Sequence, residues 1–317
     1  SIYEPVQESL CRVKERIGAV GDVSLSYQAG LLEHALESTG KRMRPAVTLL
    51  AANFNPHDDH LTETMAVAVE LLHIASLLHD DTVDDSDLRR GKATVSSTWG
   101  RNAAVVAGDY LFAKSATLVC DTGNIRVVKR FAETIMDLST GQLHEMADYH
   151  KHSQSRERYL KRIYNKTASL FTTAGESGAV LSNASELIVR NLREYGYNIG
   201  MAFQIVDDVL DFEASSEELG KPVGSDLAHG ILTLPALFAI EQQKPDNPVL
   251  RWIGNPEDFE ALSEAVEFIR STSAIENARI VAKDFGDRAL AALKNLDANT
   301  SRHSLEKIVH YVLDRRN

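Results

Sequence analysis

Cysteine is scarce in this chain: Cys11 and Cys120 are the only two among 317 residues. Two distant thiols provide neither a disulfide framework nor the ligand spacing of a structural zinc site. A reducing cytoplasm is therefore the expected location. The opening residues, Ser1 to Pro5, also lack the apolar segment of a secretory signal peptide.

Positive charge is also in short supply, with 34 lysines and arginines against 45 aspartates and glutamates and a net charge of −11. Such a balance does not suit nucleic acid, whose phosphates must be neutralised by basic side chains. No apolar run reaches the roughly 18 uninterrupted residues of a transmembrane helix, so no membrane span is expected. Hydrophobic residues still make up 44% of the chain, which is enough for a real core.

Proline is missing from the whole tract between Pro56 and Pro222. Because proline removes a backbone donor and clashes with the preceding turn, its absence over such a length predicts one helix after another. Apolar residues at helical spacing, such as Val67 and Leu71, agree with this. No strand pattern with hairpin turns, longer internal repeat or low-complexity linker stands out. The sequence therefore predicts a single all-α domain over residues 1–317.

Two aspartate clusters carry most of the information. Segments 80–84 and 207–211 share the pattern D-D-x-x-D, and each follows an apolar, helix-like stretch. Residues four apart lie on one face of a helix, so the first and last aspartates of each cluster repel each other at a cost of roughly 0.2–0.5 kcal/mol. A cation held between the clusters would offset that cost. Many carboxylate oxygens, with no cysteine and little histidine beside them, favour Mg²⁺.

Each cluster can also be explained without any functional role. The first would be a solvated acidic helix end, and the second a coincidental charge patch. Arg89 and Arg90 follow the first cluster closely, and guanidinium groups bind phosphate oxygens well. The second cluster lies inside an apolar helix, where a buried carboxylate needs a partner or a metal. The two clusters together therefore favour a metal-dependent reaction of a phosphorylated substrate.

Basic and polar residues elsewhere fit the same interpretation. The basic segment 40–45 would suit a second polyanionic substrate, although such charge runs are usually solvated. Lys166, Thr167 and Gln204 interrupt apolar helices, where an unpaired polar side chain is costly. Lys221, in a glycine-containing loop after the second cluster, would bring charge to a phosphate.

Two histidines flank the first cluster. His73 and His79 have either a functional role or an ordinary place in the core beside the aspartates. Spacing alone leaves both interpretations open.

Together these motifs resemble the trans-polyprenyl diphosphate synthases, in particular the long-chain octaprenyl and solanesyl type. The resemblance runs from segment 40–45 through both clusters to segment 233–235, with R-R-G after the first cluster and G-K-x-x-G-x-D after the second. It implies a single-domain helical bundle of the isoprenoid synthase type around a deep central cavity, usually as a homodimer. It also implies a transferase that joins isopentenyl diphosphate head to tail to an allylic diphosphate, with peripheral membrane contact for product release.

The resemblance also implies a mechanism and a role for individual residues. Three Mg²⁺ ions, with Mn²⁺ as a substitute, would assist ionisation to an allylic carbocation by neutralising the diphosphate leaving group. The direct metal ligands would be Asp80, Asp84 and Asp207, supported by Asp81, Asp208 and Asp211. The residues around the allylic diphosphate would be Arg89, Lys166 and Lys221. The residues that bind isopentenyl diphosphate would be Lys41, Arg44, His73 and Arg90. The residues that face the cation or the metal-bound waters would be Thr167, Gln204 and Gln142.

One position departs from the family pattern. Many relatives read G-K-x-T-L-P, whereas this chain has Ile231 at the lysine position. Lys221 and the metal ions would then hold the leaving diphosphate without that lysine.

Product length is expected to depend on the helix that carries the first cluster. Ala75 and Ser76, one turn before the cluster, are small, where the resemblance places aromatic rings in farnesyl-forming enzymes. A helical turn rises about 5.4 Å, roughly the length of one isoprene unit. Ala113 and Ala116 would leave further room for the growing prenyl chain. Phe131 is the candidate for the side chain that closes the far end of the cavity and so limits the product length. The sequence predicts an all-trans product of hexaprenyl to decaprenyl length, with geranylgeranyl diphosphate as the alternative.

Three other classes share part of the pattern. A class I terpene cyclase usually has an Asn/Ser/Glu-type second motif in place of the second aspartate cluster. A phosphohydrolase built around His79 would need further histidine ligands. A catalytically weak subunit of a heteromeric synthase would have lost aspartates, and all six are present here.

Overall fold

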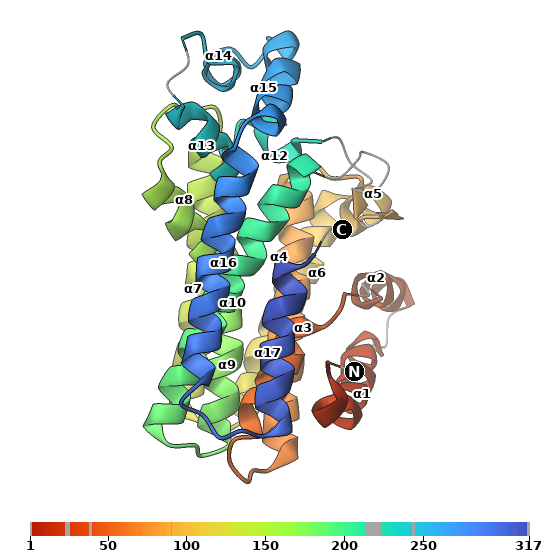
Figure 1. Cartoon of the computed structure of the whole chain (residues 1–317). Coiled ribbons are helices and arrows are strands. Elements are labelled where there is room, and N and C mark those ends of the chain that lie inside the picture. Colours follow the sequence, from red (N-terminus) through yellow and green to blue (C-terminus); the bar gives the residue numbers. More distant parts are fainter. Residues whose placement is uncertain are drawn as a thin grey trace. The chain divides into compact units, whose positions relative to one another are not determined.

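The computed structural model describes residues 2–22, 26–37, 40–89, 91–213, 223–242 and 245–315, without the side chains of residues 26 and 27. Helices dominate this part of the chain (Figure 1). Its only strands are the two-residue β1 (Leu88–Arg89) and β2 (Lys92–Ala93), which pair antiparallel. The all-α fold expected from the sequence is confirmed. Arg90 and Lys221 lie outside the described residues.

The helices follow one another through the tract without proline. Their bounds are η1 (Glu4–Val6), α1 (Gln7–Gly18), η2 (Ala19–Gly21), α2 (Ser26–Leu36), α3 (Met43–Ala52), α4 (Asp59–Val83), α5 (Val95–Trp99), α6 (Arg101–Asp121), α7 (Ile125–Asp148), α8 (Arg156–Ile163), the π-helix η3 (Tyr164–Ala168), α9 (Ser169–Leu181), α10 (Glu186–Glu213), α12 (Ser225–Ala228), α13 (Leu234–Glu241), α14 (Pro248–Gly254), α15 (Phe259–Ser271), α16 (Ala274–Leu293) and α17 (Thr300–Leu313).

The chain divides into two compact units. Unit 1 comprises Ser1–Met136, Leu170–Gly196 and Ala292–Lys307. Unit 2 comprises Asp137–Ser169, Tyr197–Ala291 and Ile308–Asn317. The single domain and the deep central cavity expected from the sequence stay predictions.

Helix α4 is the central helix of unit 1. Asp58 caps its first turn by accepting a hydrogen bond from the His60 backbone nitrogen at 2.9 Å. The helix contains neither proline nor glycine and packs against α1, α3 and α6. Gly108 of α6 lies so close that an added Cβ would come within 2.2 Å of Nε2 of His79. That nitrogen lies 3.1 Å from the Val105 carbonyl oxygen, so the half-buried His79 joins α4 to α6.

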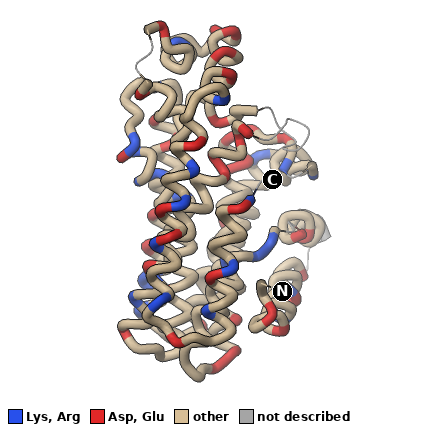
Figure 2. The backbone as a smooth tube through the Cα atoms, in the orientation of Figure 1, with Lys and Arg blue, Asp and Glu red and all other residues tan. Residues whose placement is uncertain are grey.

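Unit 2 contains α8, η3 and the helices from α12 to α15. Trp252 of α14 is buried and donates from Nε1 to the Leu227 carbonyl oxygen at 2.6 Å, which ties α14 to α12. Helices α14 and α15 pack together, and acidic positions recur along α15 (Figure 2). These contacts hold the short helices α12, α14 and α15 together.

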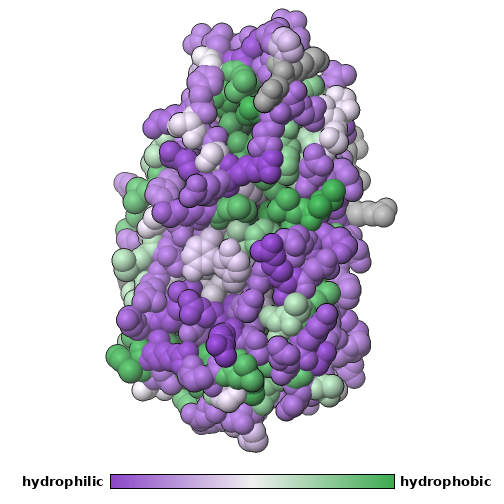
Figure 3. Space-filling model, turned by 60° about the vertical axis from the view of Figure 1, so that its left-hand side comes forward, coloured by the Kyte–Doolittle hydropathy of each residue, from purple (hydrophilic) through white to green (hydrophobic). Residues whose placement is uncertain are grey.

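Length and hydropathy alone would allow α4 and α6 to cross a membrane. In the case of α4, 78% of the apolar window is buried, as expected of a core helix. Helix α6 is more exposed, but Asp109 and Lys114 interrupt it, and charges in a bilayer are costly. On the face drawn in Figure 3, hydrophobic residues form separate patches among hydrophilic ones.

Candidate active site

The first aspartate cluster lies at the C-terminal end of α4 in unit 1. The helix ends at Val83, and the Asp84 backbone nitrogen still donates to the Asp80 carbonyl oxygen at 2.9 Å. Asp84 is exposed and Asp80 is half-buried, whereas Asp81 is only 5% exposed. The two aspartates predicted to bind metal directly are therefore the accessible ones, and the predicted supporting residue is buried.

Arg89 on β1 is the partner of Asp81. Its Nε donates to both carboxylate oxygens at 2.8 Å, and Nη2 lies 2.7 Å from Oδ1. Burial works to lower the pKa of Arg89, but the hydrogen bond and the charge of Asp81 outweigh it and raise that pKa. Gly91, with φ of 76°, turns the chain between β1 and β2. The hairpin therefore holds a guanidinium group beside the first cluster, as a diphosphate site requires.

Arg44 and His73 come together although they are far apart in the sequence. Arg44 Nη1 lies 3.2 Å from His73 Nε2, and its Cζ lies 4.4 Å from the centre of the Phe171 ring. The basic segment that leads into α3 is visible in Figure 2, and Lys41 in it is exposed. Three of the four residues predicted to bind isopentenyl diphosphate are thus described in unit 1, and two of them are in contact.

A small cavity of about 100 Å³ lies beside the pair of Asp81 and Arg89. His34, Leu78 and Lys92 are among its lining residues. Cationic and apolar groups meet there, next to the first cluster.

The second aspartate cluster lies on α10 in unit 2. Like the first cluster, it has both accessible and buried aspartates. The Asp207 side chain is 35% exposed, whereas Asp208 and Asp211 are each 3% exposed. Asp211 accepts hydrogen bonds from Ser225 Oγ at 3.2 Å and from the Asp226 backbone nitrogen at 3.3 Å. It therefore fixes the start of α12.

Arg315 near the C-terminus is the partner of Asp207. Its Nη1 lies 2.7 Å from Asp207 Oδ1, and its Cζ lies 4.7 Å from the centre of the Phe203 ring. A positive charge thus neutralises the aspartate that was predicted to bind metal. No sequence pattern predicted this contact, because it joins Arg315 to a motif on a helix far away in the sequence.

Asp208 is held by two donors. Tyr159 Oη donates to Oδ2 at 2.6 Å, and Gln204 Nε2 donates to Oδ1 at 2.8 Å. Burial, together with the charge of Asp226, raises the pKa of Asp208 to about 8, while the two hydrogen bonds and the charge of Arg162 act in the opposite direction. Gln204 Oε1 in turn accepts from Thr167 Oγ1 at 2.6 Å, so both predicted cation-facing residues are in contact.

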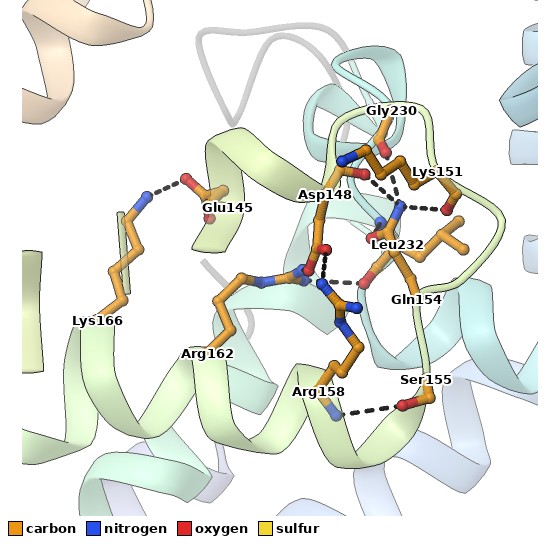
Figure 4. Close-up of polar contacts among 10 residues, drawn as sticks. All are labelled: Glu145, Asp148, Lys151, Gln154, Ser155, Arg158, Arg162, Lys166, Gly230 and Leu232. Atoms are coloured by element: carbon orange, nitrogen blue, oxygen red, sulfur yellow. Dashed lines mark hydrogen bonds and ion pairs between the residues drawn. The ribbon is translucent and has the colours of Figure 1, made fainter. Parts of the chain in front are cut away.

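Lys166 lies in η3, the π-helix between α8 and α9, and forms an ion pair with Glu145 of α7 (Figure 4). Glu145 is buried. Gln142, one turn earlier on α7, has both amide atoms buried without a hydrogen-bond partner among the described residues. A buried amide of this kind usually bonds to water or a ligand, which agrees with the position near metal-bound waters that the resemblance implied.

A second buried network fixes the segment around Ile231 (Figure 4). Arg162 Nη2 donates to the Leu232 carbonyl oxygen at 2.9 Å, and the Leu232 nitrogen donates to Gln154 Oε1 at 2.8 Å. Asp148 forms ion pairs with Arg158 and Arg162. Ile231 itself is 7% exposed. The departure from the family pattern therefore places a buried apolar side chain where many relatives have a lysine.

The positions proposed to control product length differ from one another. Ala75 is fully buried, whereas Ser76 is half-buried and donates from Oγ to the His73 carbonyl oxygen at 2.8 Å. Phe131 is buried. Ala113 is exposed on α6, and the expectation that it leaves room for the growing product stays a prediction.

Four residues near these sites were not predicted: Tyr159, Arg162, Glu145 and Arg315. A signal existed for the first three. Tyr159 and Arg162 lie on the same helical face as Lys166. Glu145 occupies an apolar position in the pattern of α7, where an acid requires a partner.

The donor set fits a divalent cation. Within the described residues, no three histidine, cysteine, aspartate or glutamate side chains form a complete metal-binding group. Mg²⁺ does not require such a group of three side chains, because it is usually bound by one or two carboxylates together with substrate phosphates and water. Asp80 and Asp84 in one unit and Asp207 in the other are accessible carboxylates of that kind.

An all-α chain with two such aspartate motifs belongs to the class of metal-dependent isoprenoid synthases. The polyprenyl synthetase family model matches residues 27–269. The chain therefore belongs to the polyprenyl synthetase family and is a prenyltransferase.

The sequences and structures of known relatives align with this chain over nearly its whole length. Heptaprenyl diphosphate synthase component 2 of Geobacillus stearothermophilus is 38% identical over 308 residues, which cover 97% of this chain and 93% of that protein. The chloroplastic solanesyl-diphosphate synthase 2 of Oryza sativa subsp. japonica is 36% identical, with coverage of 99% and 79%. The crystal structure of a polyprenyl synthase from Caulobacter crescentus, complexed with calcium and isoprenyl diphosphate, matches with a TM-score of 0.94 at 34% identity, over 100% of this chain and 97% of that one.

Replacement of Gly141 tests how Lys166 is positioned. An added Cβ would lie 2.9 Å from the Lys166 backbone nitrogen and 3.1 Å from Asn165 Cβ, so Gly141→Ala must push η3 away from α7. We expect an increase of about tenfold in the KM for the allylic substrate, since a misplacement of about 1 Å can cost far more than that. Steady-state kinetics measure it, with Gly18→Ala as the control because a Cβ added there would meet no other part of the described structure within 4 Å beyond its own helix. An unchanged KM would contradict the role of this close approach.

Removal of Arg315 tests the ion pair at the second cluster. Because its guanidinium group competes with a metal ion for Asp207, Arg315→Ala should tighten Mg²⁺ binding. The gain is limited to about fivefold, since a partly exposed ion pair contributes at most about 1 kcal/mol. Isothermal titration calorimetry without substrate measures it. Arg302→Ala, which removes a similar pair with Glu306, is the control, and weaker Mg²⁺ binding by Arg315→Ala would contradict the competition.

Proposed function

We propose that the chain condenses isopentenyl diphosphate with an allylic diphosphate to give an all-trans polyprenyl diphosphate of hexaprenyl to decaprenyl length. The observation that carries this proposal is the shared design of the two clusters. The first presents Asp80 and Asp84 and the second presents Asp207, and each buries its other aspartates against basic or hydrogen-bonding groups. The names of the heptaprenyl and solanesyl relatives support the length, as do the small side chains of Ala75 and Ser76. Geranylgeranyl diphosphate is the alternative product.

The proposed cofactor is Mg²⁺, with three ions bound and Mn²⁺ as a substitute. When bound, the ions supply Lewis-acid stabilisation of the leaving diphosphate. The chain's own residues bind and orient the substrates. Lys166 and Arg89 hold the allylic diphosphate, while Lys41, Arg44 and His73 hold isopentenyl diphosphate. Asp81 keeps Arg89 in place, and Thr167 and Gln204 present oxygen atoms to the cation.

Incubation with labelled isopentenyl diphosphate, an allylic primer and Mg²⁺ tests the function directly. Chromatography of the dephosphorylated products should give long-chain prenols. A cyclic hydrocarbon would indicate a terpene cyclase, and free phosphate without elongation a phosphohydrolase. Incorporation only after a second protein is added would indicate a subunit of a heteromeric synthase, the arrangement that the name "component 2" of one relative suggests. The presence of all six aspartates favours an active chain.

The two diphosphate sites can be separated by kinetics. Arg44→Ala should raise the KM for isopentenyl diphosphate by about tenfold or more, since a hydrogen bond to a charged group contributes about 1.5–3 kcal/mol. The KM for the allylic primer should change less. Lys166→Ala should give the reverse pattern. Equal effects on both KM values would contradict the assignment of the sites.

We also propose a homodimer, with α6 in the interface. Val105 and Val106 of this apolar helix are 41% and 66% exposed in the chain, and exposed apolar surface is usually covered by a partner. Analytical ultracentrifugation should give a dimer for the wild type and a monomer for Val106→Glu. A monomeric wild type would exclude this proposal.

A further inference from the structure

Four side chains in unit 2, three of them buried and Gln204 half-buried, form one continuous relay of hydrogen bonds. It runs from Tyr159 on α8 to Asp208 and Gln204 on α10, and then to Thr167 in η3. The three donor–acceptor distances are 2.6, 2.8 and 2.6 Å. Tyr159 is 1% exposed, Asp208 3% and Thr167 6%. Thr167 lies in the π-helix η3, an element that is rare and frequent at functional sites.

The direction of each bond follows from the chemistry of the groups. Tyr159 Oη and Gln204 Nε2 each donate to a different oxygen of Asp208, so both oxygens of that side chain act as acceptors in the relay. The amide nitrogen of Gln204 must therefore face Asp208, so its carbonyl oxygen faces Thr167. The Thr167 hydroxyl hydrogen is then committed to that carbonyl oxygen. Only the lone pairs of the Thr167 oxygen then remain available to interact with a substrate.

We propose that Tyr159 is a positioning residue that sets the polarity of this relay, so that Thr167 presents oxygen and never hydrogen to the allylic carbocation. This inference rests on the proposed function, because the cation arises only in that reaction. A hydroxyl left to rotate could point its hydrogen at the cation, which would destabilise the transition state. Preorganised dipoles avoid the cost of reorientation during the reaction.

The surroundings of Tyr159 suit this role. Burial raises the pKa of Tyr159 well above its ordinary value, and the charge of Asp208 adds to this. The phenol therefore stays protonated and remains a donor. Arg162, three residues along the same helix, has its Cζ 5.7 Å from the centre of the Tyr159 ring, which packs the ring in one orientation.

The test is a kinetic double-mutant cycle. Tyr159→Phe keeps the ring and removes the donor. We expect kcat to fall about tenfold or more, with the KM values of both substrates within about twofold of wild type. In a Gln204→Leu background the relay is already cut, so Tyr159→Phe should then change kcat by less than about twofold. Tyr195→Phe is the matched control, because Tyr195 is equally buried and donates to the Leu305 carbonyl oxygen at 2.9 Å.

Each outcome has one meaning. Tyr159→Phe with normal kcat, or with the same loss in the Gln204→Leu background, would overturn the inference. A loss equal to that of Tyr195→Phe would do so as well. If thermal melting shows that Tyr159→Phe is unfolded, Gln204→Leu replaces it. A leucine can neither donate to Asp208 nor accept from Thr167, so kcat should fall with both KM values kept, and a normal kcat would overturn the relay. Absence of condensation by the wild type would instead overturn the proposed function.

Discussion

Asp84→Ala is expected to lower kcat by about three orders of magnitude, because removal of one group that stabilises charge in a transition state can cost 10²–10³-fold or more. Asp80→Ala and Asp207→Ala should have effects of the same size. In each variant the lost carboxylate contributes to charge stabilisation that develops only as the C–O bond breaks, so kcat falls more than KM rises.

Turnover measured over a range of Mg²⁺ concentrations distinguishes the loss of a metal ligand in these variants from a loss of structure. The deficit should shrink but persist at saturating Mg²⁺, while circular dichroism stays unchanged. Asp284→Ala is a suitable control, since that carboxylate is 55% exposed and pairs only with Arg288 among the contacts observed on α16. Near-normal turnover of Asp84→Ala would show that the metal assignment is wrong.

Ser76→Phe should shorten the product by several isoprene units. Ser76 lies one turn before the first cluster and shares its face of α4 with His73 and Asp80. A ring there would block a chain growing along this face, and overpacking costs about 1–3 kcal/mol or more. Because Ala75 is fully buried, Ala75→Phe should destabilise the helix packing as well as alter the product.

Chromatography of the dephosphorylated products measures the chain length, and thermal melting separates the two variants. Ser76→Thr is the control, since it keeps the hydroxyl and adds a single methyl group. A wild-type enzyme that forms mainly farnesol, or a Ser76→Phe variant with unchanged product, would refute this route for the growing chain.

The sequence by itself determined the helical fold and the two aspartate clusters. Both depend on local rules. The tract between Pro56 and Pro222 leaves helices uninterrupted, and the D-D-x-x-D spacing puts carboxylates on one helical face. The apolar pattern around Lys166, Thr167 and Gln204 indicated that these polar side chains need partners, and each has one in the structure.

Only the tertiary structure decided which partner each of these groups has. The ion pairs of Lys166 with Glu145 and of Asp207 with Arg315, and the hydrogen bond from Tyr159 to Asp208, join residues on different helices. Long-range pairing of this kind depends on how helices pack, and helical periodicity fixes only the face on which a residue lies. For the same reason the sequence could not tell that Ala113 is exposed, or that His79 joins α4 to α6.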